Sequence, residues 1–224
     1  MKLWIFGSSM CLPYKLHESE GWPFLLATHL CCDYVNFAEE ACDNFFIYHS
    51  FLENYKKIDE KDLVIIGWSH PSRKSFVYNP KNPKHVSVVA NGIMYQKQAT
   101  TLFRSIHNVH GDWQNLTPKN SNVEFYDTYF NNYYSDYEQR CNFQSYLDSV
   151  RLRNVAKYLP FYFSKESVDQ IEYHNNNFQL EFIINNQVST SKIDLHMNAI
   201  GHRLWADQLI NQIKNNELQQ NIKI

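Results

Sequence analysis

The segment Asp62–Gly67 places four consecutive apolar residues between an aspartate and a glycine. A strand that is apolar at every position, rather than at alternate positions, is typical of a parallel sheet covered on both faces. A second run of this kind, Leu3–Phe6, stands near the start of the chain and leads into Gly7-Ser8-Ser9, a tight-turn sequence. The two runs predict buried strands of an α/β sheet.

The residues between these two runs predict two helices and one further strand. Apolar positions recur at helical spacing from about Trp22 to Leu30, with Pro23 in the first turn, where its missing N–H is not needed. A short strand is expected at Tyr34–Phe37, and a second helix over Asn44–Tyr55. The resulting strand–helix–strand–helix–strand order favours a mainly parallel, doubly wound sheet.

The remainder of the chain has a less regular pattern. We expect a hairpin over residues 170–188 whose turn is Asn175-Asn176-Asn177. The other expected elements are a helix over 96–106, one long helix or two over 123–157, a strand over 158–163, and a last helix from about 198 through 213. No repeat or linker marks a boundary, so we predict one domain over 1–215, with an insertion or variable region at about 76–121 and a polar tail over 216–224.

Composition excludes several classes of protein. The net charge of -2 and the scattered lysines and arginines argue against nucleic acid as a partner. No run reaches the roughly 18 apolar residues of a membrane span, and the start of the chain lacks a secretion signal, so we expect a cytosolic protein. Frequent asparagine with only 6 glycines is typical of AT-rich genomes, as in some viruses and low-GC microbes. The five cysteines contain no C-x-x-C pair and predict neither a disulfide framework nor a zinc site: Cys11, Cys31, Cys32, Cys42 and Cys141.

Two separated segments carry residues suited to nucleophilic catalysis. Ser9 follows the first strand, at the sheet edge where doubly wound folds bind ligands. Near the other end, Asp194 and His196 stand two residues apart, ahead of the last helix. A serine becomes a good nucleophile when an imidazole takes its proton, and a carboxylate orients that imidazole. The alternatives are that the serine only caps the following segment and that Asn198 caps a helix after a surface turn.

Taken together, these segments resemble the opening and closing signatures of the SGNH (GDSL-like) hydrolases. The resemblance rests on Gly7-Ser8-Ser9 and on the segment 194–202, Asp-Leu-His-Met-Asn-Ala-Ile-Gly-His. Residues 21–27 resemble the first helix of the family, residues 36–38 with 41–44 its second strand and loop, and residues 65–69 the end of its third strand. The family fold is a three-layer α/β/α sandwich with a flavodoxin-like sheet, and its usual activity is ester hydrolysis, often of acetyl groups on sugars.

By that resemblance, Ser9 matches the nucleophile, His196 the base and Asp194 the orienting acid. Many members place the acid three residues before the histidine, where this chain has Ile193. His202 matches no catalytic position, and we expect it to pack or cap at the start of the last helix. Asp194, His196 and His202 lack the further ligands of a metal site, so no cofactor is expected.

The oxyanion site departs most from the family pattern. Members use backbone N–H groups of the nucleophile and of a glycine, together with an asparagine side chain. Here Ser8 replaces the aspartate before the nucleophile, Ala41 falls near the glycine, and Trp68-Ser69-His70 replaces the asparagine loop. The replacement candidates for binding the oxyanion or substrate are Ala41, Asn44, Ser69, Trp68 and Arg73. The loop at 69–72 is otherwise an ordinary connection, and Trp68 either lines the pocket or belongs to the core.

The sequence therefore predicts a serine esterase or deacylase acting on a carbohydrate or another polar ester. Two alternatives stay open. One is a non-catalytic module of the same fold that binds a glycan or protein, and the other is an acyltransferase with the same triad. Cys11 has no visible partner for thiol chemistry, and we expect it to be buried and inert.

Overall fold

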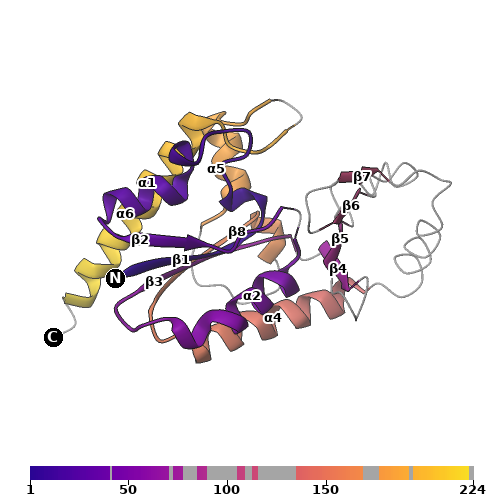
Figure 1. Cartoon of the computed structure of the whole chain (residues 1–224), viewed down its shortest axis with the longest axis horizontal. Helices are drawn as coiled ribbons and strands as arrows, with labels where there is room; N and C mark the ends of the chain where they lie inside the picture. Colours follow the sequence, from indigo (N-terminus) through magenta and orange to yellow (C-terminus); the bar gives the residue numbers. More distant parts are fainter. Residues whose placement is uncertain are drawn as a thin grey trace.

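The structure is a computed structural model that describes residues 1–40, 42–70, 73–77, 85–89, 105–108, 113–115, 135–168, 177–191 and 194–221. Its main sheet has the strand order β2 (Asp33–Asn36), β1 (Lys2–Gly7), β3 (Leu63–Trp68) and β8 (Lys157–Tyr162). All three pairings are parallel, and the strands run side by side in Figure 1. The order agrees with the start of a flavodoxin-like sheet, so the predicted doubly wound topology is confirmed.

Helices cover both faces of this sheet (Figure 1). On one face, Leu3, Ile5 and Ile65 pack against α1 (Trp22–His29), α5 (Gln179–Asn186) and α6 (Ala199–Asn221). On the other, Phe6, Val64 and Ile66 pack against α2 (Asn44–Asn54) and α4 (Asp136–Arg153). Successive side chains of a strand point to opposite faces, so the continuous apolar runs feed two separate cores. The result is the three-layer α/β/α sandwich that the family resemblance implied.

Side chains at the helix starts explain where several helices begin. The Asp43 carboxylate accepts a hydrogen bond from the N–H of Phe46 at 2.8 Å and caps α2. Asn198 Oδ1 accepts from the N–H of Gly201 at 2.9 Å and caps α6. Both contacts satisfy backbone donors that have no partner within the helix. Short 3₁₀ helices complete the main domain: η1 (Ser9–Cys11), η2 (Glu18–Glu20), η3 (Tyr55–Lys57) and η5 (Lys165–Val168).

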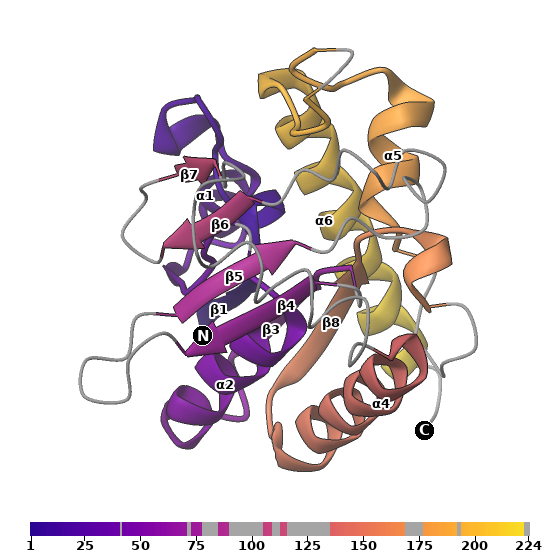
Figure 2. The same ribbon diagram turned by 90° about the vertical axis from the view of Figure 1, so that its right-hand side faces the viewer.

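A second, antiparallel sheet follows β3 in the chain. Its order is β4 (Arg73–Val77), β5 (His85–Val89), β6 (Ser105–Asn108) and β7 (Trp113–Asn115), and Figure 2 shows the four strands side by side. Figure 1 shows this sheet beyond the carboxyl ends of the main strands. The expected helix over 96–106 is wrong at its end, because Ser105 and Ile106 pair in β6; residues 96–104 lie outside the described residues.

Two other predictions need correction. The expected hairpin over 170–188 is wrong where the structure describes it, because residues 179–186 form helix α5. Leu180 and Ile183, three residues apart, are both buried on one side of this helix, and Gln187 ends it in the left-handed conformation with a φ of 55°. The last helix also continues beyond residue 215 to Asn221, where we expected a polar tail. Of the helix expected over 123–157, α4 accounts for 136–153, and residues 123–134 lie outside the described part.

Among the described helices, none combines the length and the apolar character that crossing a bilayer requires.

Candidate active site

Ser9 lies in a tight turn at the carboxyl end of β1. The N–H of Cys11 donates to Ser8 O at 2.8 Å, and the N–H of Leu12 donates to Ser9 O at 3.0 Å. Gly7 is in register with Gly67 of the neighbouring strand, so Ser9 and Ser69 follow adjacent strands at the same edge. Ser9 is 7% exposed. The structure therefore places the predicted nucleophile at the edge where this type of sheet binds ligands.

The sulfur of Cys11 fixes the turn against the two central strands. A Cβ on Gly7 would lie 2.2 Å from Cys11 Sγ, and one on Gly67 would lie 2.6 Å from it, so only glycine fits at both positions. Cys11 is fully buried, and this burial raises the pKa of its thiol. A buried thiol that stays protonated is a packing group rather than a nucleophile, as expected.

Hydrogen bonds from three elements hold the same turn in place. The carbonyl of Met10 accepts from Trp22 Nε1 of α1 at 3.1 Å and from Gln179 Nε2 of α5 at 3.2 Å. The carbonyl of Cys11 accepts from Asn36 Nδ2 of β2 at 2.9 Å. Because buried carbonyls need partners, these bonds specify one position for the turn.

Asp194 and His196 form a hydrogen-bonded pair. Asp194 Oδ1 accepts from His196 Nδ1 at 2.6 Å and also from the backbone N–H of His196 at 3.2 Å. A two-residue spacing thus suffices for the acid to orient the imidazole. Burial alone would raise the pKa of the Asp194 carboxyl. The contacts with His196 and the hydrogen bond from Lys15 together outweigh it and lower the pKa to about 2.

The same bond determines which ring nitrogen of His196 can act as a base. An ionised carboxylate can only accept a hydrogen bond, so Nδ1 carries the hydrogen and Nε2 keeps its lone pair. Nε2 is buried and has no hydrogen-bond partner among the described residues, so the Ser9 hydroxyl is not hydrogen-bonded to it. An imidazole in this state can take a proton from a group that approaches Nε2.

A short ladder between residues 188–190 and 196–198 supports the pair. The N–H of Thr190 donates to His196 O at 2.8 Å, and Thr190 Oγ1 donates to Asp194 O at 3.0 Å. Ser191 Oγ accepts from the N–H of Asp194 at 3.0 Å, and Asn198 N–H donates to Val188 O at 2.8 Å. The acid and the base therefore belong to one braced loop between α5 and α6.

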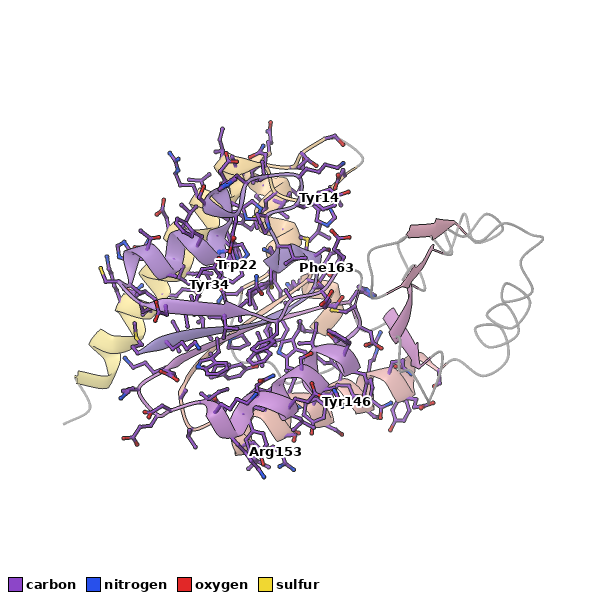
Figure 3. The ribbon with its side chains drawn as sticks, viewed as in Figure 1. Tyr14, Trp22, Tyr34, Tyr146, Arg153 and Phe163 are labelled. Carbon is purple, nitrogen blue, oxygen red and sulfur yellow. The ribbon has the colours of Figure 1, made fainter. Side chains whose placement is uncertain are left out.

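This loop contacts the segment that follows the Ser9 turn. The rings of Tyr14 and His196 are stacked, with centroids 4.1 Å apart and planes inclined by 20°. Lys15 Nζ lies 3.3 Å from Asp194 Oδ2. Tyr14 is labelled in Figure 3, in the loop after η1. The segment after the Ser9 turn and the loop before α6 are thus in contact. Sequence reasoning missed both Tyr14 and Lys15 because neither stands in a motif.

Asn44 and Ser69 are linked to each other. Asn44 Oδ1 accepts from Ser69 N–H at 2.8 Å, and Asn44 Nδ2 donates to Ser69 O at 3.0 Å. The Asn44 amide therefore positions the loop after β3. Ser69 is 1% exposed, and its hydroxyl has no hydrogen-bond partner among the described residues.

Trp68 is a core residue, which corrects its candidacy as a substrate contact. Its indole is buried, donates to Tyr158 OH at 3.1 Å and meets Phe143 of α4 edge-on at 5.3 Å. Of the remaining candidates, Ala41 lies outside the described residues, and Arg73 is the first residue of β4, paired with Val89.

His202 joins two helices instead of joining the acid–base pair. It is 1% exposed, and its Nδ1 accepts from the N–H of Trp22 at 3.2 Å, which ties α6 to the start of α1. Burial, and secondarily the nearby His196, lower the pKa of His202 to about 4. The ring is therefore neutral at pH 7 and packs at the helix start, as expected.

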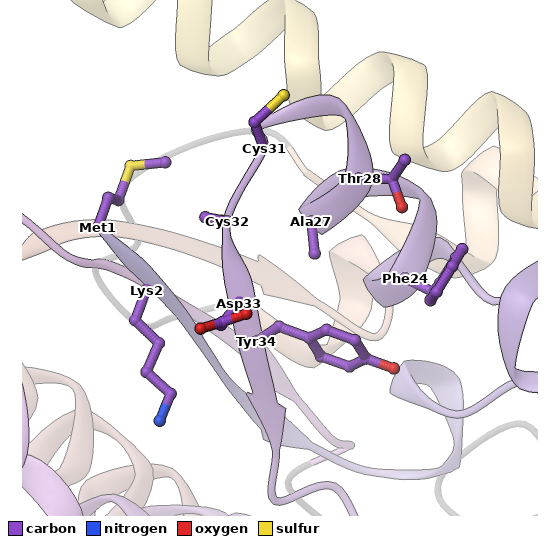
Figure 4. Close-up of a pocket in the computed structure, with 9 residues that line it drawn as sticks. All are labelled: Met1, Lys2, Phe24, Ala27, Thr28, Cys31, Cys32, Asp33 and Tyr34. Atoms are coloured by element: carbon purple, nitrogen blue, oxygen red, sulfur yellow. The ribbon is translucent and has the colours of Figure 1, made fainter.

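A hollow of about 860 Å³ lies at the opposite edge of the sheet, beside the amino ends of β1 and β2 (Figure 4). Lys2, Asp33 and Tyr34 line it together with Cys31 and Cys32. The hollow is therefore at the other end of β1 from the Ser9 turn. Across the described part of the chain, no three His, Cys, Asp or Glu side chains gather as metal ligands would.

A solved esterase structure has this fold, and weaker matches are found as well. The psychrotrophic esterase EstA of a Pseudoalteromonas species, in a structure inhibited by monoethylphosphonate, matches with a TM-score of 0.50 and 11% identity, over 96% of this chain and 97% of that chain. A lipolytic protein of the G-D-S-L family from Veillonella parvula gives a TM-score of 0.41 and 14% identity, over 94% and 97% of the two chains. An acetyl xylan esterase of the rumen bacterium Butyrivibrio proteoclasticus gives 0.46 and 11%, over 96% of this chain and 64% of that chain.

No protein-family model and no curated protein matches the sequence. At 11% identity, the likeness to EstA shows a shared fold alone.

Proposed function

We propose that this protein is a serine hydrolase that removes a small acyl group, such as acetate, from a carbohydrate or another polar ester. The observation that carries this proposal is the Asp194–His196 hydrogen bond of 2.6 Å, which leaves Nε2 as a base in the loop that contacts the segment after Ser9. Support also comes from the shared fold, since EstA is named an esterase and its structure was determined with the enzyme inhibited by monoethylphosphonate.

In the proposed mechanism, Ser9 Oγ attacks the ester carbonyl while His196 Nε2 takes the hydroxyl proton. Asp194 holds the imidazole and stabilises its protonated form. The same proton then passes to the departing alcohol, and a water molecule releases the acyl group from Ser9 by the reverse sequence. Ser9 Oγ and His196 Nε2 have to come within hydrogen-bond distance when substrate binds. Catalytic hydrogen bonds are commonly long in enzymes without ligand and shorten in the complex with substrate.

Stabilisation of the tetrahedral oxyanion falls to the backbone N–H of Ser9 and to the Ser69 hydroxyl. Ser69 follows the neighbouring strand at the same edge, its backbone is fixed by Asn44, and no described residue accepts a hydrogen bond from its hydroxyl. Preorganised donors of this kind are the usual means by which acyl-transfer enzymes lower their barrier.

The test is covalent labelling with a fluorophosphonate probe, followed by hydrolysis of p-nitrophenyl acetate. The wild-type protein is expected to be labelled at Ser9, and Ser9→Ala is expected to lose both labelling and hydrolysis. Ser8→Ala is the matched control, since it alters the adjacent serine of the same turn and should keep both. Hydrolysis by Ser9→Ala at the wild-type rate would refute the proposal. An unlabelled wild-type protein that binds glycans would instead support a binding module, and product analysis with an acceptor sugar separates hydrolysis from acyl transfer.

A further inference from the structure

Two consecutive side chains from the N-terminal part of the chain hold the acid–base pair from outside its own loop. Tyr14 covers one face of the His196 ring, with centroids 4.1 Å apart. Lys15 Nζ contacts Asp194 Oδ2 at 3.3 Å, the carboxylate oxygen that His196 does not use. Lys15 Nζ also lies 4.7 Å from the centroid of the Tyr14 ring, so the four side chains form one cluster.

The backbone at Lys15 makes this arrangement possible. Its φ of 58° is in the left-handed region, which is unfavourable for residues with a side chain. In an extended segment, neighbouring side chains point to opposite sides, whereas Tyr14 and Lys15 both reach the same pair. A strained conformation that brings two side chains to a catalytic pair is characteristic of functional sites.

We propose, on the premise that His196 and Asp194 act as described above, that Tyr14 and Lys15 are positioning residues for this pair. Tyr14 fixes the plane of the imidazole. Lys15 holds the second oxygen of Asp194, so the first oxygen stays in place to accept the hydrogen bond from His196 Nδ1.

The exposure of Lys15 limits the size of this effect. The described groups around the contact are Asp194 and His196 in one loop, Tyr14 and Lys15 in the loop after η1, and His202 of α6, which is neutral. Because the Lys15 side chain is 66% exposed, water weakens its attraction to Asp194, and we expect its loss to loosen the Asp194–His196 hydrogen bond rather than to break it.

The first test observes the Asp194–His196 hydrogen bond by NMR, which does not require the protein to be active. The signal of the His196 Nδ1 proton is assigned by its loss in His196→Gln, and its rate of exchange with water is compared at one pH between wild type and Lys15→Met at low ionic strength. The exchange is expected to be roughly 2- to 5-fold faster in Lys15→Met and to keep the wild-type rate in Lys15→Arg. The difference should shrink in about 1 M salt, which screens exposed charges. Lys61→Met, an exposed lysine in the turn before β3, is the matched control and should move nothing.

The second test measures the effect of the two positioning residues on catalysis. Lys15→Met should lower kcat roughly 2- to 5-fold and leave KM unchanged. Tyr14→Leu should lower kcat about 2- to 10-fold, as expected for losing an aromatic stack, while Tyr14→Phe should retain kcat. A purely structural role would reduce the folded fraction and leave kcat per folded molecule at the wild-type value.

The outcomes separate this inference from the proposed function. If the His196 Nδ1 proton exchanges at the same rate in Lys15→Met and wild type, the role of Lys15 is refuted, whether or not the protein hydrolyses esters. If the exchange becomes faster but the wild-type protein is neither labelled nor active, the positioning of His196 stands and the proposed hydrolysis fails.

Discussion

Replacing His202 with asparagine removes a buried titratable ring while keeping a hydrogen-bond acceptor. Asparagine Oδ1 occupies the place of His202 Nδ1, so the N–H of Trp22 keeps a partner. The change therefore isolates the effect of protonation. In the folded protein the pKa of His202 is about 4, against an ordinary value of 6.5 in the unfolded chain.

The sign follows from which state binds the proton. Between these two values the unfolded chain is protonated at His202 and the folded protein is not, so the stability present above pH 6.5 is lost as the pH falls toward 4. A shift from 6.5 to about 4 corresponds to a limit of about 3 kcal/mol. Between pH 7 and pH 5, the expected contribution is about 2 kcal/mol.

The assay is urea unfolding at several pH values between about 5 and about 8, with the free energy of unfolding extrapolated to water. Other groups titrate in this range, so the quantity to compare is the difference between wild type and His202→Asn. The variant should lose about 2 kcal/mol less than the wild type between pH 7 and pH 5. The exposed His29 provides the control, because His29→Asn should leave the wild-type pH dependence unchanged. Parallel curves for wild type and His202→Asn would show that His202 is not held neutral by the fold.

Two further substitutions test the packing of Gly67 against the Ser9 turn and the proposed oxyanion site. Gly67→Ala should destabilise the fold by about 1 to 3 kcal/mol, because its Cβ would lie 2.3 Å from Phe161 Cζ and 2.6 Å from Cys11 Sγ. Adding Cys11→Ala should restore part of the lost melting temperature. An unchanged melting temperature for Gly67→Ala would contradict this packing. Ser69→Ala should leave stability unchanged or slightly raised, since it removes a buried hydroxyl without a partner among the described residues. The same variant should lower kcat about 100-fold or more. An unaltered kcat would exclude Ser69 from the proposed oxyanion site.

The sequence was sufficient for the central layer of this fold and for the local geometry of the acid and base. Continuous apolar runs predict β1 and β3, because a strand with cores on both faces has no polar alternation to obscure it. The hydrogen bond between Asp194 and His196 could likewise be expected from the sequence, because it joins two residues of the same loop that stand two positions apart.

Errors arose where the local pattern was ambiguous. Three consecutive asparagines before Phe178 suggested a hairpin turn, although Leu180 and Ile183 also fit one face of a helix. Periodicity over such a short segment does not separate the two structures, and packing against the sheet core decides between them. The antiparallel pairing of β4 to β7 could not be predicted for a similar reason, because strand pairing depends on partners distant in the sequence.

The contact between Tyr14 and His196 was beyond sequence reasoning for a stronger reason. It joins residues separated by most of the chain, and it depends on a left-handed backbone at Lys15 that the residue type does not favour. Trp68 could have been assigned to either the core or the pocket, and only the burial by α4 decides that it belongs to the core.

The ladder that braces residues 188–198 has a consequence for how such a site can change over evolutionary time. Because Asp194 and His196 share one loop and one set of backbone bonds, a change in α5 or α6 that shifts this loop would carry both side chains along together. Their mutual alignment would survive while their distance from Ser9 changed. The pair can therefore be inherited as a unit, and selection can adjust its distance from Ser9 separately from its internal geometry.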